Sequence, residues 1–259
     1  MKVLVLGITG MLGHMVYEYF DERTDFETVG YTKDNLNALN DYDTLYNIFN
    51  NSKPDYVINC IGLIHNHVEK DLHKTFIINS AFPHMIADIG NKIGFKLIHI
   101  SSDCAFDNTI YGKSKLAGEV NSDIHLTIRT SIIGPELNPQ GTGLFNWFMN
   151  NLDIKGYDVL WDGVTTLELT EFILYSINNE LTGIIDYRST TTISKYELLL
   201  IIKEIFKTNH NISKTSLSIP SRCNDNADAY CNHEYFLQIL RLEHWIKNHK
   251  KLYGERYEV

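Results

Sequence analysis

The chain has 259 residues, of which 44% are hydrophobic and 21% charged, as in an ordinary soluble globular protein with a large core. Its formal net charge of −9 argues against a nucleic-acid partner, because phosphate-backbone binding relies on clustered Lys and Arg. No apolar run reaches the ~18 residues of a membrane span and no Cys-x-x-Cys pair is present, so we expect a cytoplasmic protein with reduced thiols.

The chain opens on an apolar run that leads into three closely spaced glycines. Residues 2–6 predict a strand buried on both faces of a parallel sheet, and Gly7, Gly10 and Gly13 follow directly. Residues 14–20 then carry an apolar helical face. Glycine lets a phosphate approach the backbone, and the positive end of the following helix attracts it. The pattern indicates dinucleotide binding; a glycine turn that only packs a helix on a strand is the alternative.

The next predicted strand, residues 26–32, ends where the adenosine ribose of a bound dinucleotide would lie. A site for NAD(H) usually carries an acidic residue there, whereas this chain has Thr32 and Lys33. Lys33 can pair with a 2′-phosphate, which favours NADP(H) and leaves NAD(H) as the alternative. A solvated loop lysine explains Lys33 equally well.

A third apolar strand, residues 55–62, ends in Gly62, which lets the backbone approach a cofactor closely. His65 and Asn66 follow this strand end and are candidate substrate contacts. The histidines and acidic residues of this loop match no zinc-site spacing, so we predict no metal. Residues 76–93 predict one long helix that contains Asn79 and is mildly interrupted at Pro83.

The predicted strand 96–100 delivers Ser102 at its end, and Tyr111 and Lys115 open the next helix. Residues four apart lie on one helical face. An ammonium group beside a tyrosine stabilises the phenolate, which makes the tyrosine a usable proton donor near neutral pH. A serine at the neighbouring strand end can hydrogen-bond a carbonyl that is being reduced. Tyr-x-x-x-Lys alone is a weak pattern, but it is specific behind a glycine turn and a serine-rich strand end.

The second half of the chain is less informative. Strands are predicted at residues 126–130 and 183–187, and helices at 144–152, 166–178, 194–206 and 243–257. Ser194 and Glu197 form a capping box. Trp147 is expected in a core stripe, with stacking on a substrate base as the alternative. Arg222 is either a contact for the pyrophosphate of a sugar nucleotide or a surface arginine.

These motifs resemble those of the extended short-chain dehydrogenase/reductases. The resemblance is closer to the dTDP-4-dehydrorhamnose reductase group and to its relatives that act on UDP-linked 4-keto-6-deoxy amino sugars. The matching stretches are Gly7–His14, Val57–Gly62, Ser101–Phe106, Tyr111–Lys115, Arg129–Gly134 and Gly163–Leu169. The resemblance extends to about Phe206.

The resemblance implies roles for individual residues. Ser102 would polarise the carbonyl, Tyr111 would be the acid, and Lys115 would tune it and hold the nicotinamide ribose. The implied cofactor-binding residues are Gly7, Thr9, Gly10, Met11, Leu12, Gly13, Thr32, Lys33, Cys60, Ile61, Gly62, Asn79, Tyr111 and Lys115. Relatives carry a longer loop before the tyrosine, whereas only residues 104–110 lie between the Ser-Asp strand end and Tyr111 here.

We therefore expect an α/β fold, a Rossmann-type doubly wound parallel sheet with a smaller C-terminal substrate-binding lobe. Residues 1–135 would form the NADP-binding domain, with return segments near 157–189, and residues 136–156 and 190–259 the lobe. The expected function is NADPH-dependent reduction of the C4 keto group of a nucleotide-linked 4-keto-6-deoxyhexose. The substrate would be dTDP-4-dehydrorhamnose or a UDP-2-acetamido-2,6-dideoxy-4-hexulose. An epimerase or dehydratase of the same family and a non-catalytic NADP-binding protein are the alternatives, and a homodimer is an open option.

Overall fold

The computed structural model describes residues 1–64, 68, 70–216, 223 and 227–257. They fall into two compact units. The first unit consists of Met1–Thr130 and Ile173–Asp186, and the second of Ser131–Phe172 and the described part of Tyr187–Val259.

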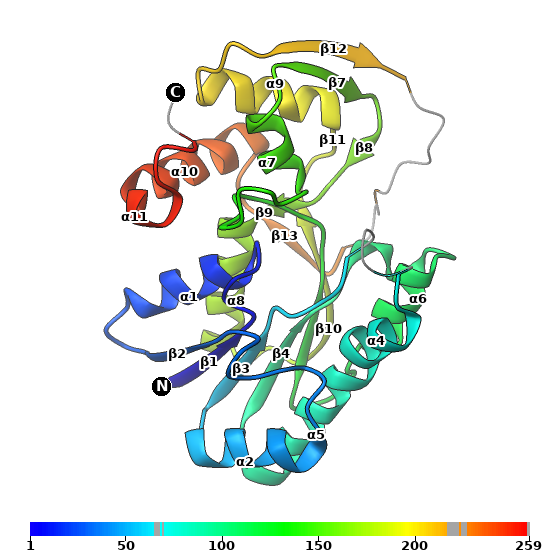
Figure 1. Cartoon of the computed structure of the whole chain (residues 1–259), viewed down its shortest axis with the longest axis vertical. Coiled ribbons are helices and arrows are strands. Elements are labelled where there is room, and N and C mark those ends of the chain that lie inside the picture. The colour runs from blue at the N-terminus through cyan, green and yellow to red at the C-terminus, as the bar shows by residue number, and fades with distance from the viewer. Residues whose placement is uncertain (65–67, 69, 217–222, 224–226, 258–259) are drawn as a thin grey trace. The chain divides into compact units, whose positions relative to one another are not determined.

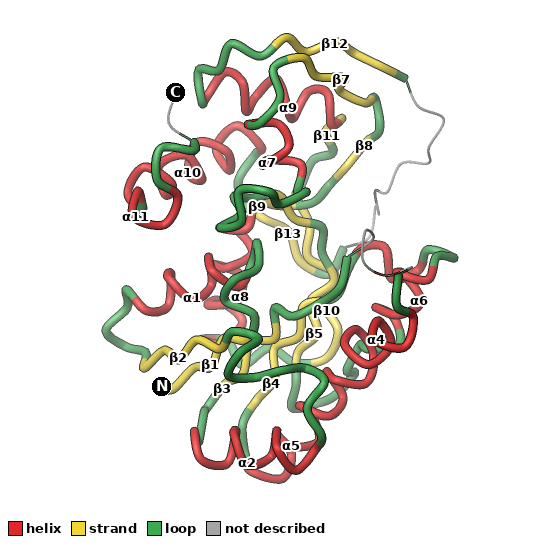
Figure 2. The backbone as a smooth tube through the Cα atoms, in the orientation of Figure 1, coloured by secondary structure: helices red, strands yellow, loops and turns green. Residues whose placement is uncertain are grey.

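A parallel sheet forms the centre of the first unit (Figures 1 and 2). The full strand order is β13-β10-β5-β4-β3-β1-β2, and every neighbouring pair is parallel. The strands are β1 (Lys2–Leu6), β2 (Glu27–Tyr31), β3 (Tyr56–Asn59), β4 (Lys96–Ile100), β5 (Leu126–Arg129), β10 (Gly183–Ser189) and β13 (Ala229–Cys231). β10 crosses between the units: its first residues pair with β5 in the first unit, and its last three pair with β13 in the second.

Both faces of this sheet are covered, which explains the near-continuous apolar runs of its strands. Leu4 and Leu6 belong to the core that also contains Leu45 and Phe49 of α2 and several residues of α5. Val3, which points to the opposite face, is also fully buried. The structure therefore confirms the predicted α/β fold with a parallel sheet.

The helices of the first unit depart from the sequence prediction at one place. They are α1 (Gly13–Asp21), α2 (Tyr42–Ser52), α4 (Leu72–Phe76), the π-helical turn η1 (Ile77–Ala81), α5 (Phe82–Ile93), the 3-10 helix η2 (Asp103–Phe106), α6 (Ile110–Leu116) and the C-terminal part of α8 (Thr166–Asn178). The segment 76–93, predicted as one helix, is interrupted by η1. A wider π turn of this kind often marks a functional position.

The described part of the second unit contains short paired strands and four further helices. Its strand pairs are β6 (Ile132–Ile133) with β9 (Val164–Thr165), β7 (Asp153–Tyr157) with β12 (Asn211–Thr215), and β8 (Leu160–Trp161) with β11 (Ile193–Ser194). Its helices are α7 (Leu144–Met149), α9 (Lys195–Ile205), α10 (Tyr235–Asn248) and α11 (Lys250–Tyr253), together with the start of α8. The capping box of Ser194 and Glu197 is present at the start of α9 and confirms that prediction.

One core prediction for this unit was wrong. Phe145 and Phe148 of α7 are fully buried, but Trp147 between them is 38% exposed. Successive helical residues point about 100° apart, so Trp147 faces away from the core that its neighbours enter.

Two findings concern the described residues as a whole. None of the helices in the described ranges is long and apolar enough to cross a membrane. All four cysteines lie among the described residues, and none of them forms a disulfide.

Candidate active site

The glycine turn between β1 and α1 lies at a reversal of strand order, since β2 and β3 flank β1 on opposite sides. Ligands of doubly wound sheets bind at the carboxyl ends of strands at such a point. Gly7 has φ +83°, and a Cβ on Gly13 would lie 2.1 Å from the Gly7 carbonyl oxygen. Both positions need glycine for the turn itself. A Cβ on Gly10 would meet only that same oxygen, at 3.3 Å, which leaves open space beside Gly10.

The start of α1 offers backbone donors to an anion. Leu12 stands at the N-cap position without a side-chain hydrogen bond, and the first turn contains no acidic residue. The first amide groups of a helix have no partners within the helix and carry the positive end of its dipole. Open space at Gly10 and an uncapped helix start fit the pyrophosphate of a dinucleotide.

The first two residues after β2, Thr32 and Lys33, carry no carboxylate. Thr32 closes the turn that follows: its Oγ1 accepts a hydrogen bond from Asp34 N at 3.3 Å, and its carbonyl accepts one from Leu36 N at 3.0 Å. Lys33 is exposed between them. The turn therefore presents a lysine where an NAD(H) site usually presents an acidic residue.

Asn79 holds the segment that follows β3. Its Oδ1 accepts from Leu63 N at 2.7 Å, and its Nδ2 donates to Leu63 O and to Ser114 Oγ, each at 3.0 Å. A Cβ on Gly62 would lie 3.6 Å from both Asn79 Oδ1 and Lys115 Nζ. The structure thus brings together three residues of the predicted cofactor site.

Lys115 is buried, and its Nζ donates to the Ile100 carbonyl oxygen at 2.7 Å. Burial lowers the pKa of Lys115 to about 8, although attraction to Glu119 and to Cys60 opposes the shift. Lys115 can therefore exchange its proton close to neutral pH. Burial raises the pKa of the Cys60 thiol to about 12, so this thiol stays protonated.

Tyr111 lies in the first turn of α6, with Lys115 one turn later on the same helical face. Thr109 caps this helix, because its Oγ1 accepts a hydrogen bond from Gly112 N at 3.0 Å. Tyr111 is half-buried and Lys115 is buried. The pair combines a phenol within reach of solvent with a fixed ammonium group behind it.

Ser102 begins η2. Its Oγ accepts from Cys104 N and donates to Asp103 Oδ1, each at 3.1 Å. The hydroxyl is buried, and by turning its proton away from Asp103 it would become a donor to a carbonyl. The short link to Tyr111 packs directly on α6, since a Cβ on Gly112 would lie 2.3 Å from the Cys104 carbonyl oxygen.

The three substrate contacts predicted outside this region, His65, Asn66 and Arg222, lie outside the described residues. Their roles stay predictions.

The family model described as RmlD substrate binding domain matches residues 1–136, which include the glycine turn and the Tyr111–Lys115 pair. The chain belongs to this family. The match confirms the resemblance to dTDP-4-dehydrorhamnose reductases that the motifs indicate.

Individual relatives of this RmlD-family chain share about 30% identity with it over about half of its length. The spore coat polysaccharide biosynthesis protein SpsK of Bacillus subtilis is 31% identical over 148 residues, which cover 51% of each protein. The methionine adenosyltransferase 2 subunit beta of Mus musculus is 29% identical over 46% of this chain and 41% of its own length. The matched part of the chain thus spans about half the length of these curated relatives or less.

The fold also matches a solved structure over nearly its whole length. The dTDP-4-dehydrorhamnose reductase of Bacillus anthracis, crystallised in complex with NADP, superposes with a TM-score of 0.78. The match covers 95% of this chain and 99% of that one at 19% identity. At this level of identity, the similarity supports the fold alone.

Sequence reasoning missed a buried ion pair beside Lys115 in the first unit. Arg129 binds Glu119 through Nε at 2.8 Å and Nη2 at 2.6 Å, and Ser101 Oγ donates to Glu119 Oε1 at 2.8 Å. The Arg129 guanidinium also lies 4.6 Å from the centre of the Phe106 ring. The available signals were the four-residue spacing from Lys115 to Glu119 and the presence of Arg129 in a family-like stretch.

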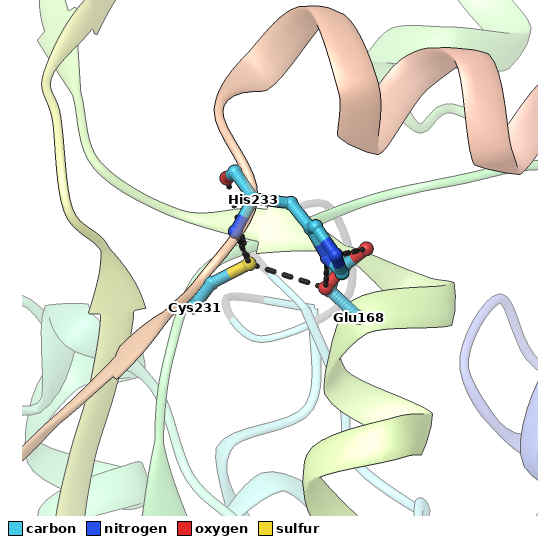
Figure 3. Close-up of side chains that lie close together, drawn as sticks. All are labelled: Glu168, Cys231 and His233. Carbon is cyan, nitrogen blue, oxygen red and sulfur yellow. Dashed lines mark hydrogen bonds and ion pairs between the residues drawn. The ribbon is translucent and has the colours of Figure 1, made fainter.

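A second polar cluster lies within the second unit and joins α8, β13 and α10 (Figure 3). Glu168 Oε2 accepts from Cys231 Sγ at 3.1 Å and lies 2.9 Å from His233 Nδ1. The Arg241 guanidinium binds Glu168 and Glu171, and its Nη1 lies 2.9 Å from His233 Nδ1.

Glu168, Cys231 and His233 offer three ligand atoms within 4.8 Å of one another, and these are the ligand types that zinc prefers. One observation argues against a metal there. Arg241 already supplies the positive charge that the carboxylates need. We therefore interpret the cluster as a structural ion pair, and the absence of a metal stays a prediction.

Arg241→Met is expected to destabilise the protein by about 2 kcal/mol, because it leaves Glu168 and Glu171 without their counter-charge. The estimate is below the usual cost for fully buried pairs, since the Arg241 side chain is 27% exposed. Urea unfolding would measure the change. Lys247→Met is the control: Lys247 pairs with Glu243 but is 63% exposed, so a change below about 1 kcal/mol is expected. Equal destabilisation by Arg241→Met and Lys247→Met would contradict the structural interpretation. An increase in the stability of the wild-type protein on addition of zinc would contradict it as well.

Proposed function

We propose that this chain is an NADPH-dependent reductase of the C4 keto group of a nucleotide-linked 4-keto-6-deoxyhexose. The substrate would be dTDP-4-dehydrorhamnose or a UDP-2-acetamido-2,6-dideoxy-4-hexulose, used to make activated deoxysugars. The proposal depends chiefly on one observation: Tyr111 and a buried Lys115 share one face of α6, and Lys115 lies against Gly62 at the end of β3. The family, and the NADP complex of the reductase from Bacillus anthracis, support the choice of cofactor.

The residues divide the work of the reduction. When bound, NADPH would supply a hydride to the C4 carbon. Tyr111 would donate its phenolic proton to the oxygen of the same carbonyl, which balances the addition. Ser102 would hydrogen-bond that oxygen, and the Lys115 ammonium would stabilise the phenolate that remains. Asn79 would keep the segment at Gly62 in place through its hydrogen bonds to Leu63.

A cytoplasmic location of the enzyme stays a prediction. A homodimer stays an open prediction.

Two alternatives differ in what they consume. An epimerase or dehydratase of the same family would use its cofactor only transiently. A non-catalytic NADP-binding protein is favoured by the short link between Ser102 and Tyr111, which leaves few residues to cover a substrate.

A turnover assay separates these functions. The purified chain would be mixed with NADPH and each of a panel of dTDP- and UDP-linked 4-keto sugars, and NADPH and sugar product would both be measured. Stoichiometric NADPH consumption is expected. Product without net NADPH consumption would identify an epimerase or dehydratase, and NADPH binding without any product would identify a binding protein.

Lys33→Asp is expected to weaken NADPH binding about tenfold or more while leaving NADH affinity nearly unchanged. The exposed Lys33 ammonium would lose its pairing with the 2′-phosphate, and the new carboxylate would repel it. Fluorescence titration with each cofactor measures both affinities. Lys155→Asp, which changes an exposed lysine on β7 in the second unit, serves as the charge-matched control. Equal effects of Lys33→Asp on the two cofactors would show that Lys33 does not contact the 2′-phosphate.

A further inference from the structure

Glu119 connects three elements of the candidate active site. Its carboxylate accepts from Ser101 Oγ at the end of β4 and from the Arg129 guanidinium at the end of β5. Glu119 itself follows the last turn of α6, four residues after Lys115. Its side chain is only 3% exposed, so water screens its charge poorly.

The same carboxylate acts on Lys115. Its negative charge favours the ammonium form of Lys115 and opposes the burial that favours the neutral amine. Arg129 reduces this attraction because it pairs with both carboxylate oxygens. The charge state of Lys115 therefore depends on the balance between the opposite charges of Glu119 and Arg129.

We propose that Glu119 is a positioning residue for the proposed reduction: it fixes the strand end that carries Ser102 and holds Lys115 as the ammonium ion. The inference rests on the proposed function for its catalytic meaning. The predicted effect of Glu119 on the pKa of Lys115 can be tested without measuring turnover.

Two further titratable groups among the described residues face Lys115. The Cys60 thiol at the end of β3 stays protonated, since burial raises its pKa to about 12. Burial lowers the pKa of His99 on β4, so this imidazole is neutral. Among the described residues, the charge that acts on Lys115 is that of Glu119, which is paired with Arg129.

The test measures the pKa of Lys115 by ¹⁵N NMR of the lysine side chains, with the signal assigned through Lys115→Arg. In the wild-type protein a value near 8 is expected. Glu119→Gln should lower this pKa by about one unit, because the attraction is lost and Arg129 stays charged. Arg129→Gln should raise it, because the Glu119 charge then acts without compensation. Ser101→Ala removes a hydrogen bond from the same network without changing its charge, and should leave the pKa of Lys115 in place.

Activity then follows the same order. The reaction needs the Lys115 ammonium, so turnover should fall as the pH rises through the pKa of Lys115. The alkaline limb of the pH–rate profile is expected at lower pH in Glu119→Gln and at higher pH in Arg129→Gln. Glu119→Asp keeps the charge and should restore the limb towards the wild-type position.

The pKa of Lys115 is expected to shift in opposite directions in Glu119→Gln and Arg129→Gln. This contrast distinguishes positioning by Glu119 from a general loosening of the structure. If both variants shift the pKa in one direction, or if Glu119→Gln leaves it unchanged, the inference is overturned. It is also overturned if the pKa shifts but the alkaline limb does not follow. If Glu119→Gln does not fold, the upward shift in Arg129→Gln decides the question. Wild-type protein without turnover would overturn the proposed function instead, a result on which the NMR titration does not depend.

Discussion

Tyr111→Phe is expected to reduce turnover of the keto-sugar substrate by at least ~100-fold while leaving NADPH affinity nearly unchanged. The variant keeps the aromatic ring and removes the one proton that the mechanism needs. An unperturbed tyrosine has a pKa of about 10 and is a slow proton donor at neutral pH. The Lys115 ammonium, one turn further along α6, stabilises the phenolate and so makes Tyr111 a better proton donor. Its hydrogen bond to the Ile100 carbonyl holds Lys115 in place.

Matched variants separate the roles of the three residues. Lys115→Ala should damage both turnover and NADPH binding, since this lysine is proposed to hold the ribose as well. Ser102→Ala should lower turnover and spare the cofactor. Tyr175→Phe, which changes a tyrosine that is 55% exposed, is the control for the loss of a hydroxyl. Stopped assays and fluorescence titration on folded protein measure the contrast. An active Tyr111→Phe enzyme would mean that the Tyr-x-x-x-Lys pair is not the catalytic pair.

Gly10→Val is expected to abolish NADPH binding while the protein remains folded. A Cβ at this position meets only the Gly7 carbonyl oxygen, at 3.3 Å, so the turn tolerates it with a small adjustment. The branched side chain would then fill the open space proposed for the pyrophosphate. Gly10→Val should therefore remove NADPH affinity and leave the stability of the fold nearly unchanged.

Gly13→Ala is the informative comparison, because it should damage the fold first. Its Cβ would lie 2.1 Å from the Gly7 carbonyl oxygen and 2.7 Å from its carbon, which the turn cannot accommodate. Thermal unfolding and NADPH titration of both variants measure the difference. Retained NADPH affinity in folded Gly10→Val protein would sink the assignment of the glycine turn to the cofactor.

Features encoded within a few consecutive residues were predicted well. The glycine turn, the strands β1 to β5 and the capping box at Ser194 all appear where the sequence indicates them. The four-residue spacing of Tyr111 and Lys115 also gives the expected shared helical face. Glycine spacing, apolar runs and helical periodicity act over a few residues, so the local sequence suffices to read them.

Helix details and side-chain exposure were predicted less well. The π turn η1 interrupts a helix whose apolar pattern looks continuous, and it carries Asn79, which bonds to Leu63 and Ser114. Trp147 lies between two buried phenylalanines and is nevertheless exposed. The π turn depends on the neighbours that the helix meets, which the apolar pattern does not specify. The exposure of Trp147 follows from the 100° step between successive helical residues, which the expectation of one apolar stripe overlooked.

The sequence by itself determined the family and the class of fold and indicated the proposed catalytic pair, because each is encoded in short motifs whose backbone geometry is local. Only the tertiary structure joined Glu119 to Ser101 and Arg129, which lie on three different elements. It also joined Glu168 to Cys231 and His233, more than 60 residues away. A charge buried by packing must find its partner wherever strand register and helix contacts bring one near, so such pairs are decided by the fold and not by spacing along the chain.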